Sequence, residues 1–317
     1  MRLHYMNKND NKIFIGIDVS KATLDISLSG KHYKINNTAK SILSFIKDSI
    51  VAKKIVLCVL ESTGGYERLA MQLLSKADVP VHRAHPNKVH AFAKACGHFA
   101  KTDKLDSILL ERYAAFISDK NVVTEIVSDS ILELQALRSV ERNLEDNLHA
   151  YQCRREHLTG KALIHLNKQV AFIKKQLVEI SKDIEELVKN DKDLSSKQHL
   201  LTSYKGVGKK TANSLMSELS ELGKLNKREI ASLVGVVPKT YESGQKIARG
   251  HIQGGRFYAR KALYMSALVA MRYNERIKIF YERLRANGKS AKIALVAVMH
   301  KIIVHLNSMI KNNEIYS

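Results

Sequence analysis

The stretch IFIGIDV at residues 13–19 is rich in β-branched side chains and predicts a strand. After a four-residue turn, LDISL at residues 24–28 forms a second run of the same kind. A third run, IVLCVL at 55–60, ends at Glu61, and a short extended piece starts at Val81. Because short apolar runs of this kind are typical of buried strands, we expect one central sheet near the N-terminus.

Helical patterns lie between and after these strands. They cover YERLAMQLLSKA after Gly65, a segment from Asn87, and a segment from Thr102 to about Ser118. Strands that alternate with helices favour an α/β layer. The sequence therefore predicts an α/β domain at residues 1–126.

An unbroken alternation of 3 and 4 in the spacing of apolar residues marks the middle of the chain. Its members are Leu163, Leu166, Val170, Ile173, Leu177, Ile180, Ile184 and Leu187. This is the a/d seam of a coiled coil, and a looser stripe lies upstream at residues 134–151. We expect a helical hairpin at residues 127–195, with arms roughly 45 Å long. Its seam favours pairing with a second protomer, and packing of the two helices within one chain is the alternative.

The remaining residues, 196–317, predict a mainly helical domain. GVGKKTA at 206–212 has the form of a helix-hairpin-helix turn, in which backbone amides with Lys209 and Lys210 can face a phosphate. An ordinary interhelical turn is the alternative. A loop over residues 238–255 is expected next, and apolar helices at about 256–273 and 290–311 complete the chain.

The charge of the chain favours a nucleic-acid partner. Its 317 residues carry 52 Lys and Arg against 31 Asp and Glu, a net charge of +21. Residues 201–317 hold 21 basic and 7 acidic side chains, so +14 of this excess lies there. Because each phosphate neutralised by Lys or Arg releases a counterion, a basic protein of this kind is typical of polyanion binding.

The rest of the composition excludes several classes of protein. A hydrophobic content of 45% is too high for a mainly disordered chain. The three cysteines lie far apart, so neither a disulfide scaffold nor a thiolate zinc site is indicated, and a reducing cytoplasm fits best. The N-terminus has no apolar signal core, and no stretch approaches the roughly 20 apolar residues that span a bilayer. We therefore expect neither secretion nor membrane insertion.

Four acidic residues are candidates for a shared metal site. Asp18 lies in the first predicted strand, Glu61 ends a later one, and Asp103 and Asp106 share one face of a predicted helix. Hard oxygen ligands suit Mg²⁺ or Mn²⁺, which assist phosphoryl transfer. Each acid taken singly is more often a cap, a turn residue or a solvated charge. Two neighbours, Asp25 and Glu67, could be confused with members of the set.

A serine in a basic segment is a candidate nucleophile. Residues 239–261, KTYESGQKIARGHIQGGRFYARK, hold six Lys and Arg, one acid and Ser243. A serine that attacks a phosphodiester needs cations to neutralise the charge that develops on phosphorus. The candidate cations are Lys239, Lys246, Arg249, Arg256 and Arg260, with Lys101 near the acids. A commonplace Ser-Gly turn is the alternative.

In their order and separation these segments resemble a known family. GIDVSKATLDISL, LESTGGYE, HPNKVHAFAKACGHFAKTDKLDS, the coiled-coil stretch, GVGKKTA and PKTYESGQKIARGHI are similar to the DEDD transposases of insertion-sequence family 110 and its 1111 group. The resemblance covers almost the whole chain. KTDKLDS and PKTYESGQKIARGHI are its most specific parts.

The resemblance implies an RNase H-like N-terminal domain similar to the junction resolvase RuvC. Asp18, Glu61, Asp103 and Asp106 match the acidic tetrad of the family, and Ser243 matches its DNA-linked serine nucleophile. It also implies that the acids of one protomer work with the serine of another in a homodimer or tetramer. A guide RNA encoded by the element would pair with donor and target DNA, in the bacterial cytoplasm at the nucleoid.

Two other functions remain open at this stage. A metal-only endonuclease of the junction-resolving type would use water in place of the serine. A non-catalytic basic nucleic-acid-binding protein would use neither the acids nor the serine.

Overall fold

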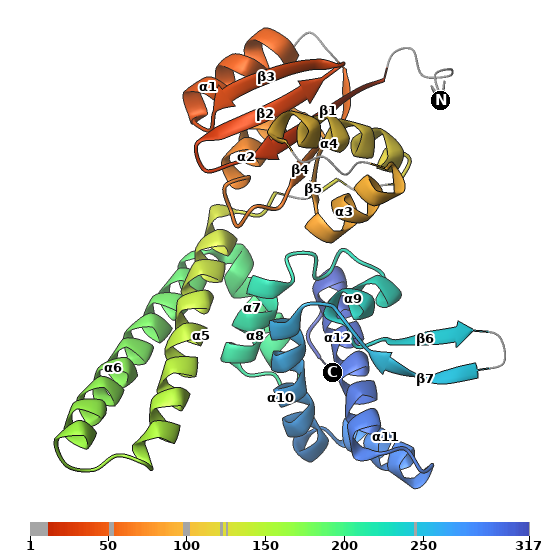
Figure 1. Cartoon of the computed structure of the whole chain (residues 1–317). Helices are drawn as coiled ribbons and strands as arrows, with labels where there is room; N and C mark the ends of the chain where they lie inside the picture. Colours follow the sequence, from red (N-terminus) through yellow and green to blue (C-terminus); the bar gives the residue numbers. More distant parts are fainter. Residues whose placement is uncertain are drawn as a thin grey trace. The chain divides into compact units, whose positions relative to one another are not determined.

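The computed structural model of the chain is shown in Figure 1. It describes residues 12–50, 54–97, 102–120, 123–124, 126–243 and 246–316, and over residues 239–250 the backbone only. The chain divides into two compact units, Met1–Ile126 and Val127–Ser317, which we consider separately as unit 1 and unit 2. The further division of the second part at residue 195 stays a prediction.

Unit 1 contains a five-stranded mixed sheet with the strand order β3-β2-β1-β4-β5. β2 pairs antiparallel with β1 and β3, whereas β4 runs parallel to β1 and β5. The strands expected from the apolar runs are confirmed. The bounds are β1 Ile13–Val19, β2 Thr23–Leu28, β3 Lys31–Asn36, β4 Ile55–Glu61 and β5 Val81–Ala84.

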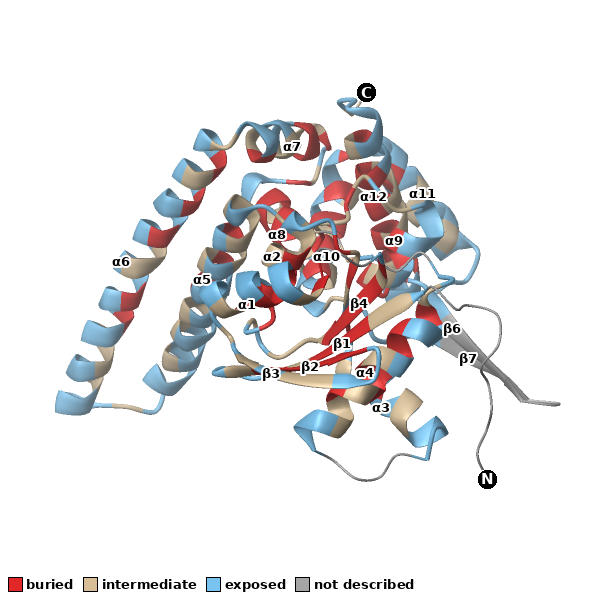
Figure 2. Cartoon of the chain, turned by 90° about the horizontal axis from the view of Figure 1, so that it is seen from above, coloured by how far each residue is buried: buried red, intermediate tan, exposed pale blue. Residues whose placement is uncertain are grey.

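β3 is absent from the predicted strands, and its place at the sheet edge explains why. All of its residues are exposed or half-buried, and Figure 2 shows the contrast with the buried strands β1 and β4. An edge strand that faces solvent needs no apolar run. The two-residue turn before it, Ser29-Gly30, has positive φ at both positions, 52° and 76°, as a tight hairpin turn requires.

Helices cover both faces of the sheet (Figures 1 and 2). Apolar residues of α1 and α2 pack with one face, and those of α3 and α4 pack with the other. A π-helical turn, Ile46–Ile50, follows α1. The helices are α1 Ala39–Phe45, α2 Arg68–Lys76, α3 Pro86–Ala95 and α4 Asp103–Ile117.

Because side chains alternate between the two faces of a strand, every second residue of β1 faces α4. Ile15 and Ile17 pack with the α1 and α2 side, so Gly16 and Asp18 face α4. α4 crosses β1 at Gly16. A Cβ there would overlap the backbone of α4 at Glu111 and Ser107 and lie 2.7 Å from the carbonyl carbon of Leu110. Glycine at residue 16 is therefore required for α4 to lie this close to the sheet.

Unit 2 begins with two long helices, α5 (Asp129–Arg155) and α6 (Gly160–Asn190), that pack against each other (Figure 1). The seam residues of α6 are buried or half-buried, and near the root of the pair Ile180 and Ile184 pack in one cluster with Leu134 of α5. The apolar seam of α6 therefore packs against α5 of the same chain. This arrangement is the alternative to pairing with a second protomer. On the outer face of α6, Phe172 and Val178 are exposed.

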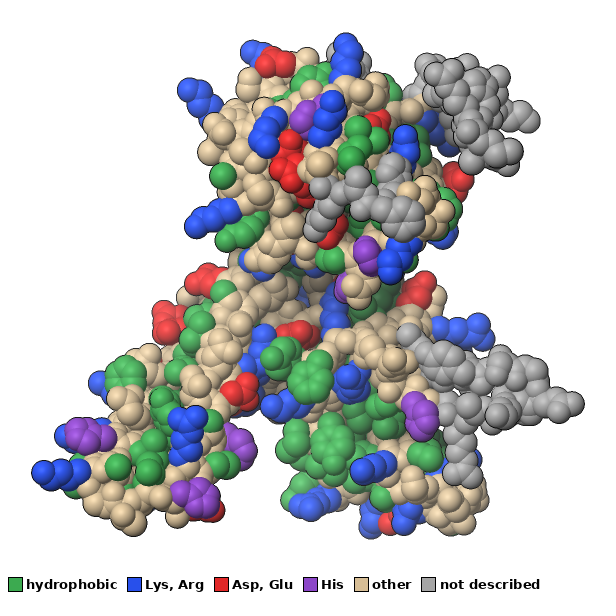
Figure 3. All heavy atoms as spheres, in the orientation of Figure 1, with side chains coloured by type: hydrophobic (Ala, Val, Ile, Leu, Met, Phe, Trp, Pro, Cys, Tyr) green, Lys and Arg blue, Asp and Glu red, His purple; other side chains and the backbone are tan. Residues whose placement is uncertain are grey.

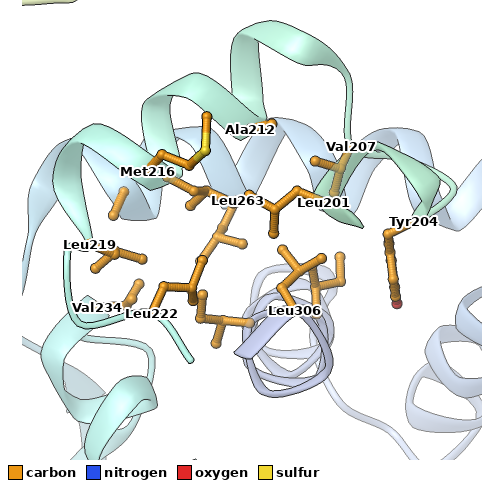
Figure 4. Packing of buried hydrophobic residues seen from close by; sticks show 14 of the residues in the cluster. Leu201, Tyr204, Val207, Ala212, Met216, Leu219, Leu222, Val234, Leu263 and Leu306 are labelled. Atoms are coloured by element: carbon orange, nitrogen blue, oxygen red, sulfur yellow. The ribbon is translucent and has the colours of Figure 1, made fainter. Parts of the chain in front are cut away.

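The other helices of unit 2 enclose its hydrophobic core, part of which Figure 4 shows. Leu201, Leu263 and Leu306, from three different helices, are fully buried there. The helices predicted near 256–273 and 290–311 are confirmed, whereas α11 was not predicted. The bounds are α7 Lys192–Ser203, α8 Lys209–Glu218, α9 Lys227–Val234, α10 Phe257–Tyr273, α11 Glu275–Ala286 and α12 Ala291–Asn312.

α12 corrects one sequence-based expectation. Over the described residues it is the one helix that is long and apolar enough to cross a membrane, so the expectation that no stretch approaches this length was wrong. Half of its most apolar window is buried inside unit 2. Its composition is therefore accounted for by its place in the core, where it packs against α10 and α11.

The expected loop at 238–255 is largely a β-hairpin. β6 (Pro238–Ser243) and β7 (Lys246–Ile252) pair antiparallel, with Pro238 opposite Ile252 and Ser243 opposite Lys246. The loop prediction was wrong because the strand residues are mostly polar or basic and lack an apolar alternation. Two glycines with positive φ, Gly254 and Gly255, connect the hairpin to α10.

Candidate active site

Two of the four predicted acids lie on neighbouring parallel strands of unit 1. Asp18 is the penultimate residue of β1, and Glu61 is the last residue of β4. Ile17 pairs with Leu60, so both acids lie at the same carboxyl edge of the sheet. The alternation that packs Val59 with the α3 and α4 side places Glu61 on the same face as Asp18.

The other two acids lie in the first turn of α4. The hydroxyl of Thr102 caps this helix by accepting a hydrogen bond from the backbone amide of Leu105, 3.3 Å away. Asp103 and Asp106 follow the cap, three residues apart, and therefore share one helix face. Negative charge in the first turn is also favoured by the helix dipole.

Electrostatics indicates that the four carboxylates share one region. Burial and, to a smaller extent, the negative charges of Asp106, Asp103 and Glu61 together raise the pKa of Asp18 from 3.8 to about 6. The part that comes from the other three acids requires their carboxylates to lie near Asp18. The sequence-predicted tetrad is thus brought together at one edge of the sheet.

The donor set fits a hard divalent cation in kind. Four carboxylates supply the oxygen ligands that Mg²⁺ and Mn²⁺ prefer, and a cation would offset the part of the raised Asp18 pKa that the neighbouring negative charges cause. Within the described part of the chain, no group of three or more His, Cys, Asp or Glu already has the arrangement that holds an ion. Ordering of the carboxylates would therefore accompany binding.

Asp25 differs from the four acids although it lies directly opposite Asp18 in the β1–β2 register. Its carboxylate is buried and already has two basic partners. The Nε2 atom of His32 lies 3.0 Å from Oδ1, and the Nζ atom of Lys34 lies 3.2 Å from Oδ2. Lys34 also approaches Asp103, at 3.9 Å between Nζ and Oδ2. Asp25 thus holds a lysine beside the acidic edge.

Glu67 shapes the turn that follows Glu61. Its buried carboxylate accepts hydrogen bonds from the backbone amides of Thr63, at 3.2 Å, and Gly65, at 2.9 Å. Gly64 and Gly65 both have positive φ, so the turn depends on glycine as well. Burial by itself would raise the pKa of Glu67, but these amides and the nearby Arg83 outweigh it, and the pKa is lowered.

Glu67→Ala is expected to destabilise the protein by about 1–3 kcal/mol, because the amides of the turn lose a buried acceptor. The lowered pKa means that this contribution is present above the unfolded-state pKa near 4.5 and is lost as pH falls through the lower folded-state value. Urea unfolding at pH 7 and at pH 3 measures both. A loss at pH 3 as large as that at pH 7 would contradict the assigned role.

A second glutamate fixes α4 on the sheet. Glu111 accepts a hydrogen bond from the hydroxyl of Ser27 and another, at 2.8 Å, from the backbone amide of Ser29. These bonds join the middle of α4 to the end of β2. They therefore hold the helix that carries Asp103 and Asp106 in place over the sheet.

The structure places Ser243 at the last position of β6, next to the turn of the hairpin. Its side chain, and those of Lys239, Lys246 and Arg249, lie outside the described atoms, as does residue Lys101. The backbone register nevertheless brings Lys246 directly opposite Ser243.

Four of the predicted cations make contacts within unit 2. Arg256 pairs with Glu221, with 2.6 Å between Nη1 and Oε2, and Arg260 donates a 3.1 Å hydrogen bond to the carbonyl of Val234. Lys210 pairs with Glu145 and Lys209 with Glu185. The two arginines hold the root of the hairpin onto the helices, and the two lysines join the start of α8 to α5 and α6.

Both parts of the chain match models of known protein families. A family model described as transposase of the IS116/IS110/IS902 family matches residues 198–282, and a DEDD transposase model of the IS110 group matches residues 15–160. The chain belongs to the IS110 family of transposases. The matched ranges contain the four acids and the serine of this transposase.

Individual relatives agree with the family. Two pilin gene-inverting proteins, from Moraxella lacunata and Moraxella bovis, are each 26% identical over 316 residues, which cover 96% of this chain and 97% of theirs. An insertion element IS110 uncharacterized 43.6 kDa protein from Streptomyces coelicolor is 30% identical over 119 residues, or 37% of this chain and 29% of that protein. This IS110-family transposase is thus an enzyme of DNA recombination.

Sequence reasoning missed the supporting residues of this transposase. Glu111 carries no local signal, because its partners Ser27 and Ser29 lie more than 80 residues away. Glu67 was noticed only as a neighbour of the acids. A glutamate that follows a Thr-Gly-Gly turn is the signal by which it could have been found, since such turns present several unpaired amides.

Proposed function

We propose that this transposase cuts and rejoins DNA to insert and excise an insertion sequence, with two groups of residues that share the work. Asp18, Glu61, Asp103 and Asp106 hold Mg²⁺ or Mn²⁺, and Ser243 is the nucleophile. The raised pKa of Asp18, caused by burial and by the other three carboxylates, is the observation that carries the proposal. Four like charges kept together are costly unless a cation joins them.

The chemistry is a pair of phosphoryl transfers. The Oγ atom of Ser243 forms a bond to the phosphorus while the bond from phosphorus to a deoxyribose oxygen breaks. The serine loses its proton, and the leaving oxygen gains one. A bound ion would polarise the phosphate and stabilise the leaving oxygen. Attack by a hydroxyl of another DNA end on the serine-linked phosphate then rejoins the DNA and frees Ser243.

The β6–β7 hairpin that carries Ser243 is rich in basic residues. Lys239, Lys246 and Arg249 lie on the same two strands as Ser243. Positive charge on the strands that carry the nucleophile would stabilise the charge that develops on the phosphate. Arg256 and Arg260 position the hairpin through their internal contacts, and Lys209 and Lys210 are nucleic-acid contacts only if phosphate displaces their glutamate partners.

The partners proposed for this transposase are donor DNA, target DNA and a guide RNA encoded by the element. The net charge of +21 supports a polyanionic partner, and the names of the Moraxella relatives support rearrangement of DNA, including inversion. The guide RNA rests on the family resemblance. A homodimer or tetramer, working in the bacterial cytoplasm at the nucleoid, would assemble through the outer face of the α5–α6 hairpin, where Phe172 and Val178 are exposed.

Ser243→Ala is expected to abolish a covalent protein–DNA adduct. The wild-type protein, incubated with Mg²⁺ and a plasmid that carries its own element and transcribed RNA, should leave protein on DNA after denaturation in detergent. Excess EDTA should prevent this. Ser308→Ala, which changes an exposed serine of α12, is the matched control and should form the adduct normally.

The same experiment separates the three functions. An undiminished adduct in Ser243→Ala would refute the serine assignment, and cleavage in excess EDTA would refute the metal role. Free 5′-phosphate ends without any adduct would favour a metal-only endonuclease. Binding without cleavage by any variant would favour a non-catalytic nucleic-acid-binding protein.

A further inference from the structure

A groove of about 1100 Å³ opens in unit 2 between α10, α11, α12 and the root of the β6–β7 hairpin. Pro238 and Ile252, which pair at the root of the hairpin, both line it. Typical small-molecule pockets have volumes of about 300–1,000 Å³, so the groove is large for a small ligand. It is open at the surface and can admit part of a longer chain.

The groove combines apolar walls with positive charge. Its lining includes Arg260, Lys261, Arg283, Lys292 and Lys301, and no Asp or Glu among the residues whose side chains the structure describes. Burial and the charges of Lys301 and Arg276 lower the pKa of one lining histidine, His305, which therefore adds little positive charge. Figure 3 shows hydrophobic side chains bordered by Lys and Arg over the C-terminal helices. An occupant must therefore offer negative charge together with apolar surface.

Aromatic rings at the groove remain open to solvent. Phe257 is 61% exposed and Tyr264 is 45% exposed, and they lie seven residues apart on the same face of α10. Phe280 on α11 already has the ammonium group of Lys301 4.6 Å from its ring centre. Exposed rings beside cations form the arrangement that stacks bases and tracks phosphates in single-strand binding.

Duplex DNA can contact the cations of the groove but cannot stack on its exposed aromatic rings. Its bases stack on one another in the interior, so a duplex offers phosphates to the lysines but no ring faces to Phe257 or Tyr264. An unpaired strand offers both. Charge and apolar surface together thus favour a single strand over a duplex.

The hairpin relates the groove to Ser243. The groove-lining root and Ser243 lie at opposite ends of β6, five residues apart, or about 16 Å along an extended strand. DNA held in the groove is thus within a few nucleotides of the serine. The strand best placed to occupy the groove is the DNA strand on which the serine acts.

We propose that this groove binds unpaired DNA next to the scissile phosphate. Its bases stack on Phe257 and Tyr264, and its phosphates contact Lys261 and Lys292. The inference rests on the proposed function, because strand exchange creates the unpaired DNA that the groove would hold.

Fluorescence anisotropy tests the groove without any cleavage. The full chain is titrated in EDTA with a labelled 12-nucleotide single-stranded DNA and, separately, with a 12-base-pair duplex. Tyr264→Ala is expected to weaken single-strand binding about tenfold and to change duplex binding less than about twofold. Tyr264→Phe keeps the ring and should bind as the wild type does.

Matched variants control for general effects. Tyr273→Ala removes a more exposed tyrosine from the same helix outside the groove, and should leave both affinities unchanged. Lys261→Gln should weaken single-strand binding and reduce its salt dependence by about one counterion, whereas Lys278→Gln, outside the groove, should change single-strand binding less.

Three results would overturn the proposal. They are equal effects of Tyr264→Ala and Tyr273→Ala, single-strand binding unchanged in Tyr264→Ala, and tenfold tighter binding of an RNA with the same base sequence. The second would point to an acidic helix of a protein partner as the occupant. Because the assay needs no adduct, loss of the adduct with intact groove binding refutes the proposed function alone, and a normal adduct with no groove effect refutes the groove alone.

Discussion

Asp18→Asn is expected to abolish strand cleavage and yet to stabilise the metal-free protein at pH 8. Burial and the three neighbouring carboxylates raise the pKa of Asp18 to about 6 in the folded protein, against an ordinary value of 3.8. The folded state therefore holds this proton more tightly than the unfolded chain does. Stability of the metal-free protein consequently falls as pH rises from about 4 through 6 and stays lower above that range.

Asparagine carries no negative charge, so the stability of the Asp18→Asn variant should not fall in this way as pH rises. The difference between the folded-state pKa of about 6 and the ordinary value of 3.8 corresponds to roughly 3 kcal/mol, and because Asp18 is only half-buried we expect about 1–2 kcal/mol. Cleavage should fall to background, since one of the four proposed metal ligands is weakened and its charge is gone.

Thermal unfolding in EDTA at pH 5 and pH 8 measures the stability difference, and the adduct experiment measures cleavage. Asp119→Asn, which changes an exposed carboxylate of unit 1, is the matched control and should alter neither. The interpretation fails if the wild type and Asp18→Asn lose the same stability between the two pH values. A variant that is more stable and inactive would show that the acids are kept together for function and against stability.

Gly16→Ala is expected to cost about 3 kcal/mol of stability and most of the cleavage activity. The added methyl group would overlap the backbone of α4 at Glu111 and Ser107, and backbone atoms cannot rotate away as a side chain can. α4 must then move off β1. Asp103 and Asp106, in the first turn of that helix, would move away from Asp18.

Chemical unfolding measures the loss of stability, and hydrogen exchange of the α4 amides locates it. Titration with Mn²⁺, followed by the stabilisation that it causes, should show weaker binding than in the wild type. Gly208→Ala is the matched control, because a Cβ there meets nothing within 4 Å. Unchanged exchange in α4 together with normal Mn²⁺ binding would show that the helix tolerates the methyl group and that Gly16 does not position the acids.

Much of unit 1 could be predicted from the sequence because its signals are local. The apolar runs around Asp18 and before Glu61 identify neighbouring buried strands, and acids at the ends of such strands meet at one edge of a sheet. The i,i+3 spacing of Asp103 and Asp106 needs only the helix period. The proximity of the four acids, though not a metal site, therefore follows from short stretches of sequence.

The remaining features depend on residues far apart in the chain. β3 has no apolar run because it lies at an edge, and the β6–β7 hairpin is too polar to show an alternation. Arg256 looked like a phosphate contact because its partner Glu221 lies 35 residues away. The seam of α6 predicted a helical partner, and α5 packs against it, but spacing cannot tell a helix of the same chain from one of a second copy.

The two-stranded ribbon that ends at Ser243 also fixes how far the serine can reach. Each added pair of residues would extend the ribbon by about 3.3 Å and turn the serine to the opposite face, whereas two added pairs would restore the face and add about 6.6 Å. The distance of the serine from the root of the ribbon and the face on which it lies therefore change together, one residue pair at a time. Insertions or deletions in this ribbon should therefore be tolerated mainly in even numbers of residue pairs, which keep the serine on the same face.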